Sequence, residues 1–578
     1  MERHHKAAVA IAACAALVLA GCGGGGDQLS SLEDCELEPA SCNAGERADG
    51  GEITWALDGS WTGWNPTMAS DNGSYLSSAL AGMWPAPGQF DPEGEYIVNE
   101  GLFDSEPHLA SEDPIVVEYT LKDGANWGDG HRIGVDDFIY HWYSTSGDDE
   151  LCAECTPANT ARGSAVESIT GSGQTVTVTY DDSYSSAEWQ YEEVLSFPAH
   201  VAEDEGFDWK DDPEDMAESQ VWFSGNAPIG WSAGPYTIAD AEAGEYVIYE
   251  PNPEWAGDTE VTLDKLTFQV IEDLDSIVTE LRQGTVDGAS PVSVDVDSIT
   301  RLEDAEDIDY RVAAGPSWEH IDLNTRGDLL DDQPLRAAVL TAIDVENIIS
   351  RTSSLVQPDA DRRRNHLFRN DAPQFVDHLT ATGQGSGDVE LAAGILEDAG
   401  YTWEPDGKLL TPDGEEVALD YRYTDSKAVR QTTAQLVQAN LADLGIEVTL
   451  DPIPDAELGG VLFGGEFDIV NFGWSTDPTF IDGASQYWDS ESSSNFGGLD
   501  NPEIDAVLDQ LDNTLDMDQA AELANQAVEL AVADAYSLPI VDSPVALMVS
   551  DRLVNVRDNW ASQERAMYNV AEWGVSES

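Results

Sequence analysis

SAGPYTIADAEAGEYVIYEPNPEWAGD, residues 232–258, follows a Gly-Pro turn with side chains that alternate between apolar and polar. Such alternation predicts a β-strand with one buried face, which we place at residues 245–249. The stretch closes with a tryptophan near a second proline, and it holds no nucleophile and base at a spacing suited to catalysis. We therefore interpret it as a framework element that holds a functional site in place.

The rest of the chain contains both strand and helix patterns. Alternating or β-branched runs predict strands at residues 115–121, 175–180, 265–270, 417–423 and 446–450. Apolar residues at helical spacing, ended by glycine, predict helices at residues 391–401 and 429–445. The last strand–helix–strand succession is a βαβ unit, which requires a right-handed crossover and a parallel pair. The sequence thus predicts a mixed α/β fold.

The first 22 residues have the layout of an export signal. A basic start is followed by an apolar run at residues 7–20, which is too short to span a bilayer comfortably, and then by small residues. Residues 19–22, LAGC, resemble the lipobox of bacterial lipoproteins, which implies cleavage before Cys22 and acylation of that cysteine. The alternative is an ordinary secreted protein in which Cys22 occurs by chance. We expect a signal peptide at residues 1–21, a flexible tether at residues 22–49, and a soluble body held on the outer face of the membrane by lipid.

The chain is extremely acidic, with 112 Asp and Glu against 25 Lys and Arg and a formal net charge of −87. Such a surface repels nucleic-acid phosphates, which argues against a nucleic-acid-binding role. It indicates adaptation to a saline habitat, because salt screens the self-repulsion that weakens a compact state. Calcium storage is the alternative, but residues 294–307 lack the glycine and the terminal glutamate of an EF-hand loop.

Four cysteines lie beyond the signal region, in two closely spaced pairs. We expect Cys35 with Cys42, and Cys152 with Cys155, to form local disulfides, because exported proteins mature under oxidising conditions. Residues 152–155, CAEC, could instead form a redox or zinc motif. No second such pair and no histidine cluster stands near them in the sequence, so the disulfide is favoured.

Seven segments, the opening stretch among them, resemble segments of one protein family and occur in that family's order. They are residues 121–142, 232–258, 271–289, 321–349, 392–401, 466–478 and 535–542. The family is the extracellular solute-binding proteins of family 5, the dipeptide- and oligopeptide-binding type that serves ABC importers. Each segment is short, but their common order along most of the chain makes the resemblance specific.

The resemblance implies a periplasmic-binding-protein-like α/β fold of type II, cluster C, with two lobes and an additional inserted domain. Lobe I would comprise residues 50–88, 211–317 and 537–578, the inserted domain residues 89–210, and lobe III residues 318–536. The chain would cross between the lobes near Trp318 and Tyr536. The ligand would lie between the lobes, and the inserted domain would contribute little to its contacts.

The resemblance also implies a binding protein rather than an enzyme. Closure of the lobes would capture a small solute, a peptide being the first choice, and an ABC permease with its ATPase subunits would import it. No cofactor and no metal are expected, and the protein would be a monomer. One alternative is an enzyme, although the mature sequence contains no GxSxG, HExxH, P-loop or GxGxxG motif. Another is a surface sensor of the same fold.

Residues 466–478 supply the first candidate ligand contacts. They follow an apolar strand, and α/β folds present ligands at the C-terminal ends of strands. In peptide-binding relatives, an aspartate after the Gly-Trp pair of this segment holds the peptide's α-ammonium group. Asp477 is the matching residue, and Trp474 would form a wall of the site. Alternatively, Asp477 is a turn residue that precedes Pro478.

Four further candidates follow other strands or crossings. Trp64 and Asn65 lie in a Gly/Asn/Pro-rich loop after the first strand of lobe I, and Trp318 and His320 flank a crossing. An aromatic side chain at such a place indicates either ligand stacking or burial in the core. A single histidine is more often structural than ligand-binding.

Two further stretches stand out, one against the pattern of the peptide binders and one against the acidic composition of the chain. Residues 79–99 form a longer and more proline-rich loop than the relatives have, which leaves oligosaccharides, nickel chelates, haem and opines as alternative ligands. Residues 362–369, RRRNHLFR, are the only basic cluster. This cluster could recognise a carboxylate, dock a partner or offset neighbouring acids.

Overall fold

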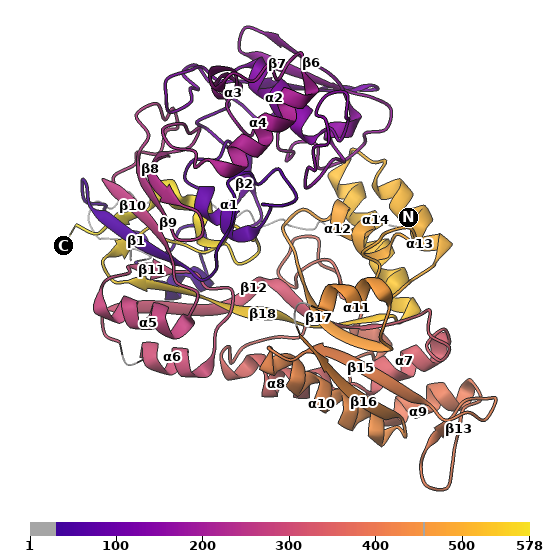
Figure 1. Ribbon diagram of the computed structural model, residues 1–578. Coiled ribbons are helices and arrows are strands. Elements are labelled where there is room, and N and C mark those ends of the chain that lie inside the picture. The colour runs from indigo at the N-terminus through magenta and orange to yellow at the C-terminus, as the bar shows by residue number, and fades with distance from the viewer. Residues whose placement is uncertain (1–29, 304, 455–456, 578) are drawn as a thin grey trace, which may run out of the picture.

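The structure, a computed structural model, describes residues 30–303, 305–454 and 457–577 (Figure 1). The expected signal peptide and the expected lipidation site, Cys22, lie outside the described residues. Among the residues that are described, no helix is both long and apolar enough to cross a membrane.

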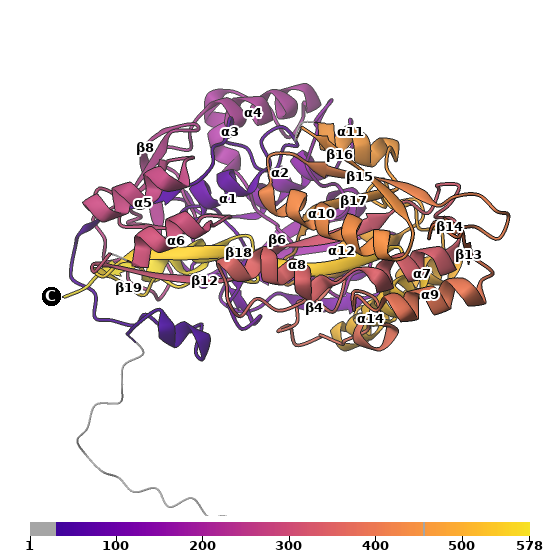
Figure 2. The same cartoon turned by 90° about the horizontal axis from the view of Figure 1, so that it is seen from below.

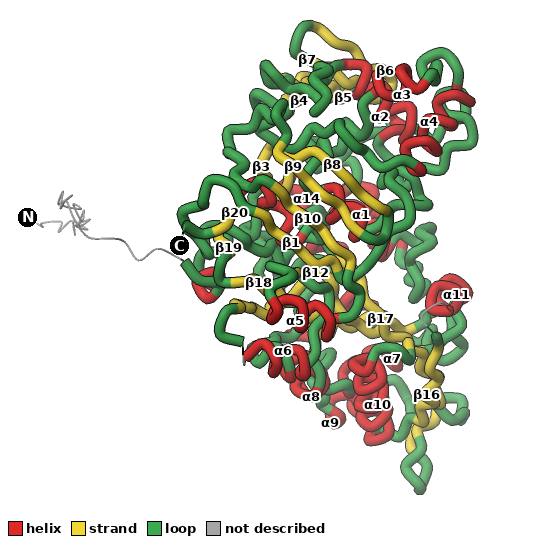
Figure 3. The backbone as a smooth tube through the Cα atoms, turned by 60° about the vertical axis from the view of Figure 1, so that its left-hand side comes forward, coloured by secondary structure: helices red, strands yellow, loops and turns green. Residues whose placement is uncertain are grey.

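A ten-stranded mixed sheet runs through the molecule and joins its two lobes (Figures 2 and 3). Two long antiparallel strands, β12 (Ile308–Leu323) and β18 (Ser537–Ser550), form its middle. The order across the sheet is β16, β15, β17, β12, β18, β11, β1, β10, β9, β8. The other strands are β1 (Glu52–Leu57), β8 (Tyr236–Glu242), β9 (Tyr246–Pro251), β10 (Lys265–Val270), β11 (Gly288–Ala289), β15 (Ala418–Thr424), β16 (Glu447–Ile453) and β17 (Ile469–Ser475).

The opening stretch of the sequence forms the edge of lobe I. Its two alternating halves are β8 and β9, which pair as an antiparallel hairpin, so the strand predicted at residues 245–249 is confirmed. Next to the hairpin, β10 pairs in parallel with β1 and buries Leu266 and Phe268 completely. Helices α5 (Leu274–Gln283) and α6 (Val296–Glu303) pack beside these strands (Figure 1).

The predicted βαβ unit lies in lobe III. Strands β15 and β16 are parallel neighbours, and α10 (Ala428–Asp443) connects them and packs its apolar side against the sheet. This confirms the mixed α/β class. The remaining helices of lobe III are α7 (Gln333–Ala342), α8 (Val345–Arg351), α9 (Val389–Asp398), α11 (Leu458–Gly464), α12 (Ile481–Trp488), α13 (Pro502–Leu511) and α14 (Met517–Asp534).

The inserted domain contains a separate four-stranded antiparallel sheet in the order β4, β5, β7, β6. Its strands are β4 (His108–Glu112), β5 (Ile115–Thr120), β6 (Val166–Ser172) and β7 (Thr175–Tyr180), and helices α2 (Val135–Thr145) and α3 (Ala199–Glu205) accompany them. Helix α4 (Pro213–Gly225), at the start of the second segment of lobe I, packs against α2. One continuous cluster of buried residues extends from this domain into lobe I. The rings of Phe197 and Phe223 stack at 4.3 Å, and Trp231 packs edge-on against both. The inserted domain and lobe I therefore share one core.

One short helix and three two-stranded pairs are the remaining α-helices and strands of the described residues. Helix α1 (Ser74–Leu80) follows the first strand of lobe I. The two-stranded pairs are β2 (Gly88–Phe90) with β3 (Tyr96–Val98), β13 (Thr402–Trp403) with β14 (Leu409–Leu410), and β19 (Leu553–Val554) with β20 (Gly574–Val575).

The chain crosses between the lobes where the ladder between β12 and β18 is interrupted. Pairing stops at Ala314 with Pro544 and resumes at Trp318 with Asp542. One crossing is therefore at residues 315–317, directly before Trp318.

The second crossing differs from the expectation. Tyr536 does not mark it, because residues 537–542 still pair with β12 inside lobe III. The strand leaves lobe III only at Ser543. Proline has no backbone N–H to donate to a ladder, and Pro316 and Pro544 stand at the interruption, which explains why the pairing breaks here.

Both expected disulfides are present, Cys35–Cys42 and Cys152–Cys155. The first corrects the expected tether at residues 22–49. Its two cysteines are buried, and Arg557 donates a hydrogen bond from Nε to the carbonyl oxygen of Cys42 at 2.8 Å. The described part of this segment, from residue 30 onward, is therefore packed onto lobe I rather than free, because the disulfide closes a small loop whose apolar side joins the core.

Candidate functional site

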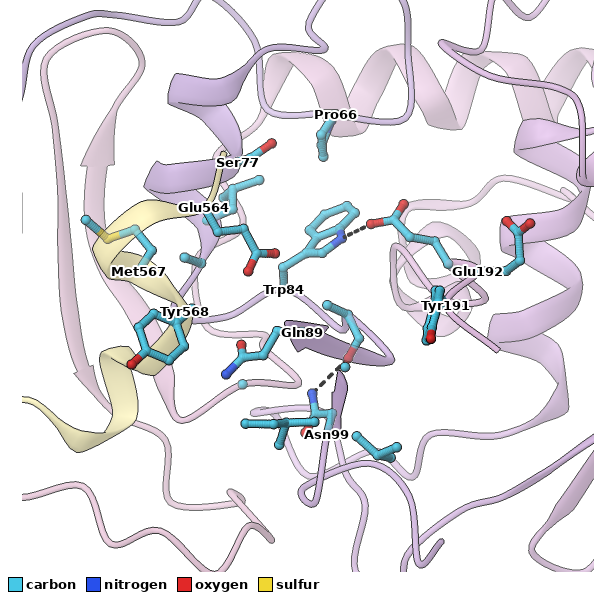
Figure 4. Close-up of a pocket in the computed structure, with 18 of the residues that line it drawn as sticks. Pro66, Ser77, Trp84, Gln89, Asn99, Tyr191, Glu192, Glu564, Met567 and Tyr568 are labelled. Atoms are coloured by element: carbon cyan, nitrogen blue, oxygen red, sulfur yellow. Dashed lines mark hydrogen bonds between the residues drawn. The ribbon is translucent and has the colours of Figure 1, made fainter. Parts of the chain in front are cut away.

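A cavity of about 670 Å³ lies where lobe I, the inserted domain and the edge of lobe III meet (Figure 4). Its volume falls in the range of roughly 300–1,000 Å³ that is typical of small-molecule sites. Figure 4 shows Trp84 near its centre, with Glu564 on one side and Tyr191 and Glu192 on the other. The cavity thus brings together segments from the beginning, the first third and the end of the chain.

The loop at residues 79–99 forms one wall of the cavity. Trp84, Gln89 and Asn99 all line it, and they come from the loop itself and from the short pair β2 and β3 that it contains. The Trp84 ring is half-buried, packs edge-on against Phe197 at 5.4 Å, and donates a hydrogen bond from Nε1 to Glu193 Oε1 at 3.3 Å. The loop at residues 79–99, in which this sequence departs from the peptide binders, therefore shapes the cavity.

A later part of the inserted domain, residues 141–193, forms the opposite wall, so this domain lines much of the cavity. The lining residues of this part are His141, Thr145, Ala158, Asn159, Arg162, Gly163, Glu188, Tyr191, Glu192 and Glu193. Lobe III contributes only Thr479 and Asp482. The physical reason is the shared core of the inserted domain and lobe I, which holds residues 188–193 against α1 and the loop that follows it.

Seven carboxyl groups line the cavity, from all three parts of the molecule. They are Glu100, Glu188, Glu192, Glu193, Asp482, Glu564 and Glu572. Burial raises the pKa of five of them, Glu188, Glu192, Glu193, Asp482 and Glu564. Neighbouring carboxylates raise the pKa of Glu188, Glu192 and Glu564 further, because they repel one another across the cavity.

Three of these groups have pKa values close to neutrality. Burial raises the pKa of Glu188 to about 8 and those of Glu192 and Glu564 to about 7. Glu564 remains accessible to water inside the cavity, while the protein atoms around it still disfavour its charged form. A cation in the cavity would favour the charged form of these groups and would itself be held by charge-assisted hydrogen bonds.

One cationic side chain lines the same space. Arg162 is buried, and its Nε donates a hydrogen bond to the Tyr180 hydroxyl at 2.7 Å. Its attraction to the Glu192 carboxylate opposes the effect of burial on the pKa of Glu192. Arg162 can offset only one of the seven carboxyl groups, so acidic side chains outnumber basic ones in the cavity lining.

Asp477, the strongest candidate from the sequence, does not line this cavity. Its carboxylate instead accepts hydrogen bonds from the C-terminal segment of lobe I: from Gln563 N–H and Gln563 Nε2, both at 2.9 Å, and from Ser562 Oγ at 3.3 Å. Trp474, on the same segment, packs against Phe496 and Tyr487. Asp477 thus contacts the opposite lobe.

A second contact between the lobes lies beside the cavity. Glu188 Oε1 accepts a hydrogen bond from the backbone N–H of Phe480 at 2.8 Å. Together with the Asp477 contacts, it joins lobe III to the body formed by lobe I and the inserted domain. The lobes therefore touch at the mouth of the cavity in this conformation.

Trp64 and Asn65 lie in the core rather than at the cavity. Asn65 is fully buried, its Nδ2 donates to Gln220 Oε1 at 3.0 Å, and its Oδ1 accepts from Thr67 Oγ1 at 2.6 Å. The Trp64 ring packs edge-on against Trp61 at 5.6 Å. Trp64 is therefore buried in the core, which is the second of the two interpretations. The polar atoms of Asn65 form hydrogen bonds within the protein.

Trp318 and His320 are also buried, at the start of lobe III. Their rings lie 4.6 Å apart, and His320 packs edge-on against Phe472 at 4.2 Å. The guanidinium group of Arg363 lies 4.5 Å from the centre of the Trp318 ring. Neither Trp318 nor His320 lines the cavity.

The basic cluster at residues 362–369 is internal. Arg363 is fully buried, forms an ion pair with Asp542 and donates from Nη2 to the carbonyl oxygen of Leu367 at 2.7 Å. Arg369 donates from Nη1 to the carbonyl oxygen of Gly315 at 2.6 Å. Both arginines therefore brace the crossings between the lobes, a role that the sequence alone did not reveal.

The sequence and the fold match known proteins along most of the chain. The family model described as "Bacterial extracellular solute-binding proteins, family 5 Middle" matches residues 99–496. The oligopeptide-binding protein OppA of Mycobacterium tuberculosis is 28% identical over 558 residues, which cover 93% of this chain and 89% of that protein.

Solved structures give the same picture. The periplasmic EDTA-binding protein EppA is 30% identical, with a TM-score of 0.83, and the match covers 93% of this chain and 99% of that one. The oligopeptide-binding protein AppA of Bacillus subtilis, solved in complex with a nonapeptide, is 18% identical with a TM-score of 0.68, covering 92% and 100%. NikA of Brucella suis, solved in complex with Fe(III)-EDTA, is 17% identical with a TM-score of 0.71, covering 91% and 100%.

Proposed function

Because this chain belongs to the bacterial extracellular solute-binding proteins of family 5, we propose that it captures a positively charged peptide and delivers it to an ABC import permease. The cavity described above is the binding site in this proposal. Closure of lobe III against the other two parts encloses the peptide, and release occurs when the lobes separate.

The observation that carries the proposal is the charge of the enclosed space. Glu192, Glu193 and Glu564 line one cavity. Burial raises the pKa of all three, and repulsion by neighbouring carboxylates raises those of Glu192 and Glu564 further. An ammonium or guanidinium group of a ligand removes this penalty, and its interaction with a carboxylate strengthens as water leaves. An anionic ligand would add to the repulsion instead.

The peptide class rests on the match to OppA and on the other residues of the wall. Trp84 and Tyr191 offer aromatic faces to ligand side chains, and Gln89 offers an amide to a peptide backbone. A cavity that combines apolar faces with a few polar groups is the usual form of a small-molecule site.

A metal chelate is the second candidate, because EppA, which is named for EDTA binding, is 30% identical to this chain. EDTA is a polycarboxylate, so its free form and its complexes with divalent metals carry negative charge. The carboxyl groups around the cavity would repel such a ligand. The two candidates therefore predict opposite preferences for ligand charge.

We further propose that acylation of Cys22 holds the protein on the outer face of the cell membrane, where it acts as a monomer. The segment from residue 30 to residue 49 packs on lobe I, so an anchor at Cys22 would attach to the body formed by lobe I and the inserted domain. Labelling cells with an alkyne-bearing fatty acid tests this, because the wild type should take up the label and Cys22→Ala should not.

Thermal unfolding at high salt tests the ligand class. A ligand that binds only the folded protein stabilises it by RT ln(1 + [L]/Kd). Short peptides rich in Lys and Arg should raise the Tm more than peptides of equal length in which Glu and Asp replace them. Nickel–EDTA and iron–EDTA should have no effect. A larger shift with the chelates, or with the acidic peptides, would contradict the proposal.

A further inference from the structure

Two histidines and one aspartate converge on the surface of the inserted domain, away from the cavity. Asp129 and His131 lie in the turn between Trp127 and α2, and His200 is the second residue of α3. The carboxylate of Asp129 contacts a nitrogen of each ring. His200 Nε2 is 2.7 Å from Asp129 Oδ2, and His131 Nδ1 is 3.2 Å from Asp129 Oδ1. One potential ligand atom from each residue lies within 4.8 Å of the other two.

The arrangement is close to the geometry of a tetrahedral metal site. Zinc bonds of roughly 2.0–2.1 Å to nitrogen and oxygen place neighbouring ligand atoms about 3.3 Å apart. The observed 2.7 Å and 3.2 Å separations reach this value with a movement of about 0.6 Å or less, which side-chain rotation supplies. Imidazole nitrogen suits zinc, copper and nickel, and three protein ligands leave a position open for water or another ligand.

The local structure fixes the position of the aspartate. Asp129 Oδ1 accepts a hydrogen bond from the backbone N–H of His131 at 3.0 Å. The rings of His131 and His200 are stacked with centres 3.9 Å apart, so the two imidazoles lie next to each other beside the same carboxylate.

Both histidines use the same carboxylate. His200 Nε2 faces Asp129 Oδ2 and His131 Nδ1 faces Asp129 Oδ1, so one aspartate gathers two imidazoles at one point of the surface. A divalent ion shared by the three side chains would take a lone pair from each imidazole and one from the carboxylate.

We propose that Asp129, His131 and His200 bind a divalent transition-metal ion of the zinc, nickel or copper class. The site is separate from the proposed peptide cavity, because none of the three residues lines it. Binding links the turn that carries Asp129 to the start of α3, and it therefore stabilises the inserted domain. The proposal departs from the expectation of no metal, and the cluster is not evident in the sequence because His200 lies 69 residues after His131.

Zinc binding by the untagged protein tests the proposal. Titration with Zn²⁺ should be measured by calorimetry in about 1 M NaCl, where a Debye length of about 3 Å suppresses diffuse binding to the acidic surface. One zinc ion should bind with a defined affinity, and excess Mg²⁺ should not displace it. His131→Ala and His200→Ala should each lower the affinity at least about 10-fold, since even the loss of an outer partner costs 10–100-fold.

His108→Ala is the matched control, because His108 is an exposed histidine of the same domain and lies outside the cluster. This variant should bind zinc as the wild type does. Visible absorption of bound Co²⁺ gives a second readout, which should be present in the wild type and in His108→Ala and lost in His131→Ala. The proposal is overturned if the double variant His131→Ala, His200→Ala binds Zn²⁺ as tightly as the wild type, or if the wild type shows no one-to-one binding.

Discussion

The carboxylate of Asp477 in lobe III accepts two hydrogen bonds from Gln563 in lobe I, one from its backbone N–H and one from its side-chain amide, each at 2.9 Å. These bonds join two segments that lie on different sides of the crossings. They exist only when the lobes are together, so Asp477 contributes to the closed form whether or not it touches the ligand.

Replacing Asp477 by asparagine should therefore weaken ligand binding without removing a ligand contact. The lost charge weakens hydrogen bonds that contribute about 1–2 kcal/mol, which corresponds to roughly 5–30-fold in Kd. Calorimetry with the best peptide ligand measures this change, and small-angle scattering should show a more open unliganded protein. Asp500→Asn, an exposed aspartate of the same lobe, serves as the control and should change neither quantity. A complete loss of binding would instead place Asp477 in direct contact with the ligand.

The cavity carboxylates should make the stability of the unliganded protein depend on pH. The pKa of Glu192 is about 7 in the folded protein against an ordinary value of 4.5, so the folded state binds more protons between these pH values. The contribution of Glu192 to the free energy of unfolding is therefore full below about pH 4.5 and is lost as the pH rises through about 7. Glu192→Gln should flatten the fall of Tm between pH 5 and 8, while Glu205→Gln, on the surface of α3, should leave it unchanged.

The same groups should make binding of a cationic peptide stronger at higher pH. Deprotonation of Glu192 and Glu564 near pH 7 creates the charges that attract the ligand. The peptide-induced rise in Tm should therefore be larger at pH 8 than at pH 5.5. A rise that is independent of pH would show that these carboxyl groups do not contact the ligand.

Trp84→Ala should lower the affinity for peptide more than it lowers stability. The ring is half-buried and lines the cavity, so its loss removes an aromatic contact that contributes about 1–3 kcal/mol, or roughly 5–150-fold in Kd. Trp222 is a suitable control, because it is a half-buried tryptophan of α4 that does not line the cavity. Equal losses of affinity in Trp84→Ala and Trp222→Ala would contradict the assigned site.

Gly315 should tolerate no side chain, because a Cβ atom there would lie 2.6 Å from Val545 Cγ1 on the neighbouring strand. Overpacking of this kind costs about 1–3 kcal/mol, so Gly315→Ala should lower the Tm of a chain of this length by about 1–3 °C. Adding Val545→Ala removes the clash, and the double variant should be more stable than the sum of the two single effects predicts. Gly394→Ala in α9 should instead raise the Tm, because a Cβ atom at this position meets nothing within 4 Å and alanine favours a helix.

The fold could be predicted from the sequence wherever local pattern decides it. The βαβ unit around α10 is an example, because strand alternation, helical spacing and a terminal glycine are all readable within about 40 consecutive residues. The position of the second crossing was wrong by several residues. It depends on which residues of β18 pair with β12, and that register is fixed by partners more than 200 residues away.

The site could be predicted much less well. Asn65 has the loop position of a ligand-binding residue, but its amide is engaged by Gln220, 155 residues later in the chain. The loop at residues 79–99 was identified as a departure from the peptide binders, although nothing in its sequence indicates that Trp84 meets Glu193. Glu192 could not be singled out at all, since it is one of 112 acidic residues and only the fold encloses it.

Both connections between the lobes run side by side, as neighbours in one ladder, rather than as separate linkers. Two adjacent strands of one ladder restrict the relative movement of the lobes more than two separate linkers would. A rotation of lobe III that changes the twist at the interruption keeps the ladder on either side intact, whereas a sliding movement would break its hydrogen bonds. We therefore expect any separation of the lobes to be a rotation at residues 315–317 and 543.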